Sequence, residues 1–409
     1  MANCRRTLTM TNQIEERRQR LRDAHRSAFG TRPSDIRFAV APYRICPLGA
    51  HVDHQLGLVT GLTIDSGILL AYSPSSGGHV HLSSRNFPGE VEFEIGNIPP
   101  VSPGDWGNYA RGAALALRSK YAIQTGIDGV IEGNLPAGGI SSSAAAGVAY
   151  LLALEEVNGL DISQQENVQL DRQIENGYIG LNNGILDQSV ILLAERGRLL
   201  RLDCQSRTHD SLSYPSDAPR YEVTLVYSGL SRSLASTDYN RRVTECLEAA
   251  KLLLQYEGEP VKAFPVLRDV SKETFAAYGH LLPEALRKRA QHFFEENARV
   301  PRGVDAWRAG DLKRFGELVN ASGESSIRNY ESGAPHLMTL YRMLSQMPGV
   351  YGARFSGAGF RGSAVALTDP EAREEIVRQI KTEYPIAHPD IQDSFSIHIC
   401  QPGPGATLQ

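Results

Sequence analysis

The sequence predicts a mixed α/β protein of two domains, and three observations support this. First, its 409 residues exceed the length at which a single hydrophobic core usually stops growing. Second, strand-like and helix-like runs are mixed in both halves of the chain. Third, the segment 206–219 is rich in Ser, Asp and Pro, which is typical of a boundary between domains. We therefore expect an N-terminal domain over 1–215 and a C-terminal domain over 216–409.

The expected elements follow from apolar spacing. A leading amphipathic helix is expected over 14–29, with Gly30 as its end. Short β-rich runs predict strands over 36–40, 58–64, 68–72, 129–132, 199–202, 221–226, 352–355 and 364–367. Helical spacing predicts helices over 106–118, 142–157, 163–175, 185–195, 240–256 and 282–299.

Composition limits the partners and the compartment. The formal charge of -4 provides no broad basic field, so neither nucleic acid nor a membrane surface is expected to bind. The first thirty residues lack the apolar core of a secretory signal, and no later stretch reaches about 18 uninterrupted apolar residues. The five cysteines are odd in number and lack C-x-x-C spacing, which indicates a reducing compartment. We expect a cytoplasmic protein; whether it is a monomer or a dimer stays open.

The segment 135–144, L-P-A-G-G-I-S-S-S-A, has the composition of a phosphate cradle and leads directly into an alanine-rich helix. Glycines let the backbone approach an anion, and the first N–H groups and the dipole of the helix favour negative charge there. Consecutive serines add hydroxyls for phosphate oxygens or Mg²⁺. The alternative is an ordinary Ser N-cap after a Gly turn.

The segment 41–54, A-P-Y-R-I-C-P-L-G-A-H-V-D-H, places an arginine, two histidines and an aspartate among apolar residues. A zinc site at His51, Asp53 and His54 is disfavoured, because adjacent positions rarely converge on one ion. A structural salt bridge between Arg44 and Asp53 is the stronger alternative to a functional site. Cys46 is expected to be a buried structural thiol.

Two further turns carry weaker signals. The segment 183–188, N-G-I-L-D-Q, opens an apolar helix with Asp187 in its first turn, where the helix dipole alone favours a carboxylate. The segment 356–362, S-G-A-G-F-R-G, lies between two strand-like runs and indicates a tight turn with close backbone approach.

Taken in this order, the segments resemble the three signature motifs of the GHMP small-molecule kinases, in the galactokinase branch. Two more stretches resemble that branch: W-G-N-Y at 106–109, and D-Y-N-R-R at 238–242. The resemblance implies an N-terminal domain of the ribosomal-S5-like type and a ferredoxin-like C-terminal domain, with the active site between them.

The resemblance also implies roles for individual residues. Asp187 matches the catalytic aspartate and Arg44 its partner arginine, while ATP and Mg²⁺ are the implied cofactors. The sugar would be lined by His51, Asp53, Asn183, Gly184 and Tyr239. The nucleotide would be bound by Trp106, Tyr109, Pro136, Gly138, Gly139, Ser141, Ser142, Ser143, Ala144, Gly357 and Gly359. Ser143 would also touch Mg²⁺.

Ala50 departs from the galactokinase pattern, which has at this position a glutamate that binds the sugar 6-hydroxyl. A carboxylate at C6 would be repelled by that glutamate by about 4 kcal/mol at about 4 Å and an effective dielectric near 20. The wording of 41–54 is similar to that of plant galacturonokinases, which favours galacturonate as substrate. Arg232 is the candidate partner of the C6 carboxylate. Alternatively, Arg232 is a solvated loop arginine, and His51 or backbone N–H groups bind the carboxylate instead.

Two other functions are compatible with the resemblance. One is a kinase for galactose, N-acetylgalactosamine or another neutral sugar, because alanine permits a uronate without enforcing one. The other is a non-catalytic sugar sensor. Such sensors tend to lose serines of the second motif, whereas Ser141, Ser142 and Ser143 are present here together with Arg44 and Asp187.

Overall fold

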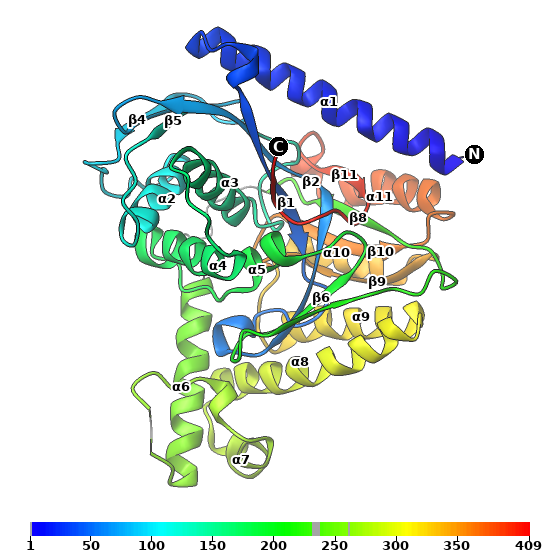
Figure 1. Ribbon diagram of the computed structural model, residues 1–409. Coiled ribbons are helices and arrows are strands. Elements are labelled where there is room, and N and C mark those ends of the chain that lie inside the picture. The colour runs from blue at the N-terminus through cyan, green and yellow to red at the C-terminus, as the bar shows by residue number, and fades with distance from the viewer. Residues whose placement is uncertain (1, 231–237, 261) are drawn as a thin grey trace.

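The computed structural model describes residues 2–230, 238–260 and 262–409. In this part of the chain the strands form two sheets flanked by helices (Figure 1). The first sheet has the order β12-β1-β2-β5-β3-β4, with β6 paired to β2 and β7 to β6. The second sheet has the order β11-β8-β10-β9, and all its pairs are antiparallel. The predicted mixed α/β class is confirmed.

The first sheet is covered on both faces, by α1 on one face and by the main core on the other. Its strands are β1 Arg37–Ile45, β2 Leu58–Ser75, β3 His79–Ser84, β4 Glu90–Glu94, β5 Gly126–Gly133, β6 Leu199–Asp203, β7 His209–Leu212 and β12 Thr407–Leu408. Phe38 and Leu69 pack against Leu21 of α1, whereas their neighbours Ala39 and Leu70 belong to the main core. Both faces are therefore buried, which explains the nearly continuous apolar runs of β1 and β2.

The strand β2 replaces two expected strands, because the chain stays extended between 64 and 68. Gly67 pairs with Pro42 of β1, and a Cβ at Gly67 would lie 2.4 Å from the carbonyl oxygen of Ala41. A glycine at this place allows two strands to approach closely and does not end the strand.

Helices of the first half frame the sheet. They are α1 Ala2–Phe29, α2 Asn108–Arg118, α3 Ser142–Val157, α4 Gln164–Arg172 and α5 Leu186–Leu193, with a π-helical segment Gln173–Ile179 after α4. The helix α1 begins twelve residues before the expected start and ends where expected, before Gly30 at φ 68°. It crosses the top of the molecule in Figure 1.

The second half contains the second sheet and six helices in its described residues. The strands are β8 Glu222–Tyr227, β9 Val350–Phe355, β10 Ser363–Thr368 and β11 Ser396–Cys400. The helices are α6 Tyr239–Glu257, α7 Lys272–Tyr278, α8 Glu284–Arg308, α9 Leu312–Arg328, α10 Pro335–Gln346 and α11 Arg373–Ala387. Within the described chain, no helix combines the length and apolar character needed to cross a bilayer.

The halves are joined at the edge of the first sheet and at the loop between β1 and β2, among other contacts. The C-terminal strand β12 pairs with β1, so the end of the chain completes the first sheet. The loop between β1 and β2 rests on α8, where a Cβ at Gly303 would lie 2.1 Å from a methyl group of Leu48. The expected domains over 1–215 and 216–409 remain a prediction.

Candidate active site

Arg44 and Asp187 form the central ion pair. Arg44 stands near the end of β1, and Asp187 lies in the first turn of α5. Nε of Arg44 donates to Oδ1 of Asp187 at 2.7 Å, and Nη2 lies 2.6 Å from the same oxygen. The guanidinium is 3% exposed, whereas the carboxylate keeps 23% exposure. A buried cation thus holds a carboxylate that remains reachable. Asp53, the alternative partner of Arg44, instead accepts a hydrogen bond from the backbone N–H of Leu186.

Ser141 holds the other oxygen of that carboxylate. Its hydroxyl donates to Oδ2 of Asp187, and its φ of 56° lies in the left-handed region, which is uncommon for serine. Because the Ser141 side chain turns to Asp187, it does not cap α3. The ordinary Ser N-cap is therefore wrong for this helix. The first N–H groups of α3 have no capping side chain, which suits the binding of an anion.

Two glycine-rich loops from opposite halves of the chain pack main chain against main chain. Gly138 and Gly139 have φ values of 138° and 79°. A Cβ at Gly139 would lie 2.8 Å from the carbonyl oxygen of Ser356, and one at Gly357 would lie 3.0 Å from Cα of Gly139. The hydroxyl of Ser363 donates to the carbonyl of Gly138 at 3.0 Å. The glycines of 356–362, a weak signal in the sequence, therefore allow the main chain of this loop to approach that of Gly138 and Gly139.

Ser143 lies beside a buried carboxylate that the sequence motifs did not single out. Glu175, in the π-helical segment, is 1% exposed, accepts a hydrogen bond from the side-chain amide of Asn183 and lies beside Ser143. Burial, and then the charge of Asp187, raise the pKa of Glu175 to about 7. Tyr109 also lies beside Ser143. A hydroxyl and a carboxylate therefore converge beside the start of α3.

Asp53 lies next to the N-terminal turn of α5. Its Oδ2 accepts a hydrogen bond from the backbone N–H of Leu186 at 3.3 Å. A Cβ at Gly184 would lie 2.4 Å from the same oxygen, so only glycine fits there. Burial, and then the charge of Asp187, raise the pKa of Asp53 to about 6. Asp53, Gly184 and Asp187 are thus brought to one place.

Aromatic rings gather around His51 and His54. The His51 ring is stacked on Tyr330, with centroids 4.1 Å apart and planes 8° apart. His51 has a φ of 60°, and its Nε2 is buried without a hydrogen-bond partner among the described residues. A ring nitrogen of His54 bonds to the Tyr330 hydroxyl at 3.1 Å, and Tyr239 meets the His54 ring edge-on. Strain and an unpaired nitrogen at His51 are typical of a ligand site.

The remaining predicted residues are less informative. Ala50 is buried, and its environment is described below. Trp106 is half-buried and donates through Nε1 to the carbonyl of Pro88 at 3.3 Å. Arg232 lies outside the described residues. Pro136, Ser142 and Ala144 lie within the segment 135–144. Gly359, in the turn 356–362, has a φ of 75°. Their contacts with a nucleotide remain a prediction.

Four side chains near these motifs were missed by sequence reasoning: Glu175, Tyr330, His292 and Glu296. Nothing in the spacing of the sequence relates Glu175 to Ser143. His292 and Glu296 are four residues apart on one helix, which marks a shared face and does not reveal what that face contacts.

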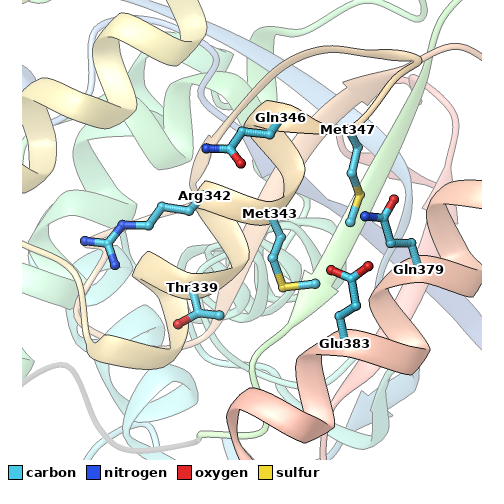
Figure 2. A pocket seen from close by; sticks show the side chains of 7 residues that line it. All are labelled: Thr339, Arg342, Met343, Gln346, Met347, Gln379 and Glu383. Carbon is cyan, nitrogen blue, oxygen red and sulfur yellow. The ribbon is translucent and has the colours of Figure 1, made fainter.

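A separate cavity of about 380 Å³ lies between α10 and α11 (Figure 2). Thr339, Arg342, Met343, Gln346, Met347, Gln379 and Glu383 line it. None of these residues belongs to the cluster around Asp187, so the cavity does not contribute to this site.

Comparisons with known proteins match both halves of the chain. Residues 108–195 match the GHMP kinases N terminal domain, and residues 304–386 match the GHMP kinases C terminal domain. A galacturonokinase of Arabidopsis thaliana is 45% identical, over 95% of this chain and 97% of its own length. A galactokinase of Roseiflexus sp. (strain RS-1) is 33% identical, over 94% and 95%.

Solved structures agree with these relatives. Lactococcus lactis galactokinase complexed with galactose superposes with a TM-score of 0.86 at 31% identity, over 94% of this chain and 98% of its own. A mevalonate kinase shares the fold, with a TM-score of 0.62 at 15% identity. On the identity and coverage of these relatives, the chain is a sugar kinase of the galactokinase type and belongs to the GHMP kinase family.

Proposed function

We propose that this protein is a galacturonokinase, which transfers the γ-phosphoryl group of ATP to the anomeric hydroxyl of D-galacturonic acid. The products are α-D-galacturonate 1-phosphate and ADP. The similarity to a galacturonokinase at 45% identity, against 33% for a galactokinase, supports this substrate. Ala50 is the observation that carries it, because the pocket lacks the acidic side chain that would repel a uronate.

Asp187 is assigned the role of base. Its carboxylate accepts the proton of the anomeric hydroxyl while that oxygen bonds to the γ-phosphorus. The bond from the γ-phosphorus to the bridging oxygen breaks, and its electron pair leaves with ADP. Arg44, buried against Asp187, orients the carboxylate and offsets charge that develops on the transferred group. Ser141 fixes the second carboxylate oxygen.

The residues fit a triphosphate and Mg²⁺. The uncapped start of α3 and the glycine loop at 138–139 offer backbone N–H groups to phosphate oxygens. Ser143 and Glu175 present the hard oxygen ligands that Mg²⁺ prefers, and a cation there would relieve the cost of the buried Glu175 carboxylate. When bound, Mg²⁺ supplies positive charge that neutralises the phosphates.

The sugar is assigned to the cluster of Asp53, His51 and Tyr239. The buried Nε2 of His51, which has no hydrogen-bond partner among the described residues, suits a ligand rich in hydroxyl groups, because such an atom is costly without a partner. We place C6 at Ala50 and His51. The unpaired Nε2 of His51 is available to the C6 carboxylate, and the amides of Gly49 and Ala50 are not, because Glu296 accepts from both.

The test is a substrate panel. ATP consumption with Mg²⁺ is measured against galacturonate, glucuronate, galactose, N-acetylgalactosamine and glucose, with kcat/KM as the measure of discrimination. Phosphorus NMR of the product identifies the phosphorylated position. The proposal requires the highest kcat/KM for galacturonate and an anomeric phosphate.

Two other outcomes are informative. A higher kcat/KM for galactose keeps the family and the roles of Asp187 and Arg44 but rejects the uronate. Sugar binding without turnover on any member of the panel rejects the kinase activity and favours a sugar sensor.

A further inference from the structure

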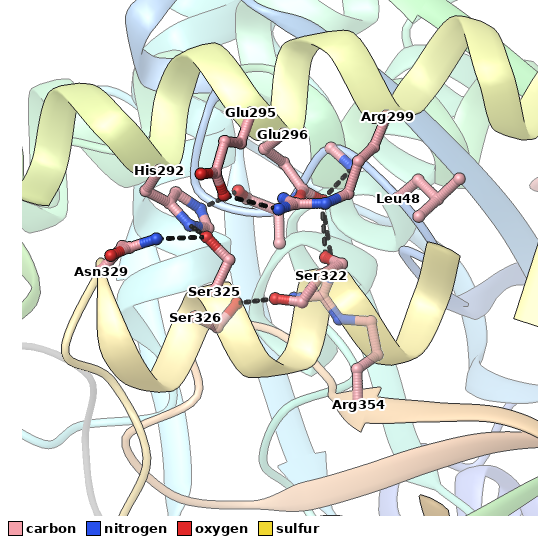
Figure 3. Close-up of polar contacts among 12 residues, drawn as sticks. Leu48, His292, Glu295, Glu296, Arg299, Ser322, Ser325, Ser326, Asn329 and Arg354 are labelled. Atoms are coloured by element: carbon pink, nitrogen blue, oxygen red, sulfur yellow. Dashed lines mark hydrogen bonds and ion pairs between the residues drawn. The ribbon is translucent and has the colours of Figure 1, made fainter. Parts of the chain in front are cut away.

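Glu296 and His292, which lie on one turn of α8 (Figure 3), bind the main chain of Ala50 at its amide and its carbonyl, respectively. Oε1 of Glu296 accepts the N–H of Gly49 at 2.8 Å and that of Ala50 at 3.2 Å. Nε2 of His292 lies 2.9 Å from the carbonyl oxygen of Ala50. Glu296 is 0% and His292 1% exposed, so water does not compete for these bonds.

The proton on His292 is placed by its neighbours. The side-chain amide of Asn329 donates to the Ser325 hydroxyl at 3.1 Å, and that hydroxyl lies 3.0 Å from Nδ1 of His292. Ser325 therefore accepts from Asn329 and donates to Nδ1. A neutral imidazole with Nδ1 as acceptor carries its hydrogen on Nε2, which donates to Ala50. Burial lowers the pKa of His292, which favours the neutral ring.

Glu296 is anchored from the opposite side. The Ser322 hydroxyl donates to its Oε1 at 2.6 Å, and Arg299 donates to Oε2 at 2.6 Å. Arg354, at the end of β9, donates to Ser322 at 2.8 Å. The carboxylate is thus fully engaged and fixed in position, so the amides of Gly49 and Ala50 are fixed with it.

The next residue, His51, is held by the same region. Its ring is stacked on Tyr330, which directly follows the Asn329 that begins the hydrogen-bond chain to His292. His51 has a φ of 60°, in the left-handed region that is unfavourable for a residue other than glycine. Such a conformation persists only where surrounding contacts hold it. Here His292 contacts the carbonyl of Ala50, the residue immediately before His51.

We propose that His292 is a positioning residue for the sugar. By donating to the Ala50 carbonyl, it fixes the peptide that joins Ala50 to His51 and so sets where both residues stand at position 6 of the sugar. The inference rests on the proposed placement of the sugar at these residues, and it adds that α8, from the other half of the chain, determines the geometry of the loop that discriminates at C6.

The experiment compares three substitutions in the full-length protein. His292→Leu removes the donor to Ala50, and His292→Gln keeps an N–H close to the position of Nε2. His25→Leu is the matched control, because His25 is also a fully buried imidazole whose ring nitrogen lies 3.0 Å from a backbone carbonyl, that of Asp128 under α1. Thermal unfolding confirms that each variant folds. The sugar is the one that the wild type uses with the highest kcat/KM.

For His292→Leu we expect the sugar KM and the calorimetric sugar Kd to rise about fivefold or more, since a buried carbonyl without its donor costs at least about that factor. The KM for ATP should stay within about twofold, and His292→Gln should recover most of the loss. His25→Leu should lower the unfolding temperature with no change in the sugar KM.

An unchanged sugar KM in His292→Leu overturns the inference, as does an equal rise in the KM values for sugar and ATP, which indicates a merely structural role. Because the comparison uses whichever sugar the wild type prefers, its result does not depend on galacturonate being that sugar.

Discussion

The hydroxyl of Ser141 donates to Oδ2 of Asp187, while Arg44 binds Oδ1 of the same carboxylate. The serine comes from the glycine-rich loop before α3, and the arginine from β1. The loop suited to phosphate and the proposed base are therefore one hydrogen-bonded unit. A change in either is expected to affect phosphoryl transfer more than sugar binding.

Asp187→Asn is expected to lower kcat about 10²-fold or more, because an amide cannot accept the sugar proton. The sugar Kd should stay within a few-fold, since Arg44 retains the amide oxygen as its acceptor and the amide nitrogen can donate to the Ser141 hydroxyl. Steady-state kinetics and calorimetry measure the two quantities. The exposed Asp161→Asn serves as control. Turnover at the wild-type rate in Asp187→Asn would remove the base from the mechanism.

Arg44→Ala is expected to lower kcat about 10²-fold or more, because the charge that offsets the transferred phosphoryl group is lost. Arg37→Ala is the control: it changes an arginine of the same strand that pairs with Glu156 at 3.6 Å and is 42% exposed. Single-turnover kinetics separate the transfer step from product release. If both variants lose activity equally, the effect belongs to β1 as a whole and not to the ion pair.

Ala50→Glu is expected to reduce kcat/KM for galacturonate by about 10²-fold or more and to leave or raise that for galactose, because a carboxylate there repels a uronate by about 4 kcal/mol. Ala50→Gln introduces the same bulk without charge and separates crowding from repulsion. The two sugars are compared in competition. Equal losses on both sugars in Ala50→Glu would contradict the assignment of Ala50 to position 6.

Gly139→Ala is expected to lower both stability and kcat. A φ of 79° strains an alanine. The new Cβ would lie 2.8 Å from the Ser356 carbonyl oxygen, and relief of this contact pushes the two glycine loops apart. Gly197→Ala shares the strain, with a φ of 72°, but its Cβ meets open space. Thermal unfolding and the KM for ATP are measured for both. A Gly139→Ala enzyme no worse than Gly197→Ala would show that loop contact is not required.

Glu155→Gln is expected to stabilise the protein at pH 8 relative to pH 5. Burial raises the pKa of Glu155, which lies in α3 and accepts from Asn167, to about 7. The folded state therefore holds a proton that the unfolded state has lost, so the contribution of Glu155 to stability falls as pH rises between about 4.5 and about 7. The glutamine has no charge to bury, which removes a cost on the order of 3 kcal/mol above pH 7.

Unfolding free energies of the wild type and Glu155→Gln at pH 5 and pH 8 measure this difference. Glu195→Gln, an exposed glutamate after α5, should show no such pH dependence. An equal effect of Glu155→Gln at both pH values would show that Glu155 does not hold the extra proton of the folded state.

Apolar spacing predicted most elements, because the period of the buried positions follows directly from helix and strand geometry. The helices expected over 142–157 and 240–256 appear as Ser142–Val157 and Tyr239–Glu257. The leading helix and β2 were predicted too short. In the first case polar residues hid the helix before 14, and in the second Gly67 resembled a break although it only allows β1 to approach.

By itself, the sequence determined the fold class and the family, because the motifs at 41–54, 135–144 and 356–362 keep their order and residue types along the chain. Only the tertiary structure decided which side chains meet. It brought Glu175 to Ser143, Ser141 to Asp187, and His292 and Glu296 to the main chain of Ala50. The two residues of each pair are 32 to 246 residues apart, and the contacts of His292 and Glu296 join a side chain to a backbone atom. Neither feature leaves a period in the sequence.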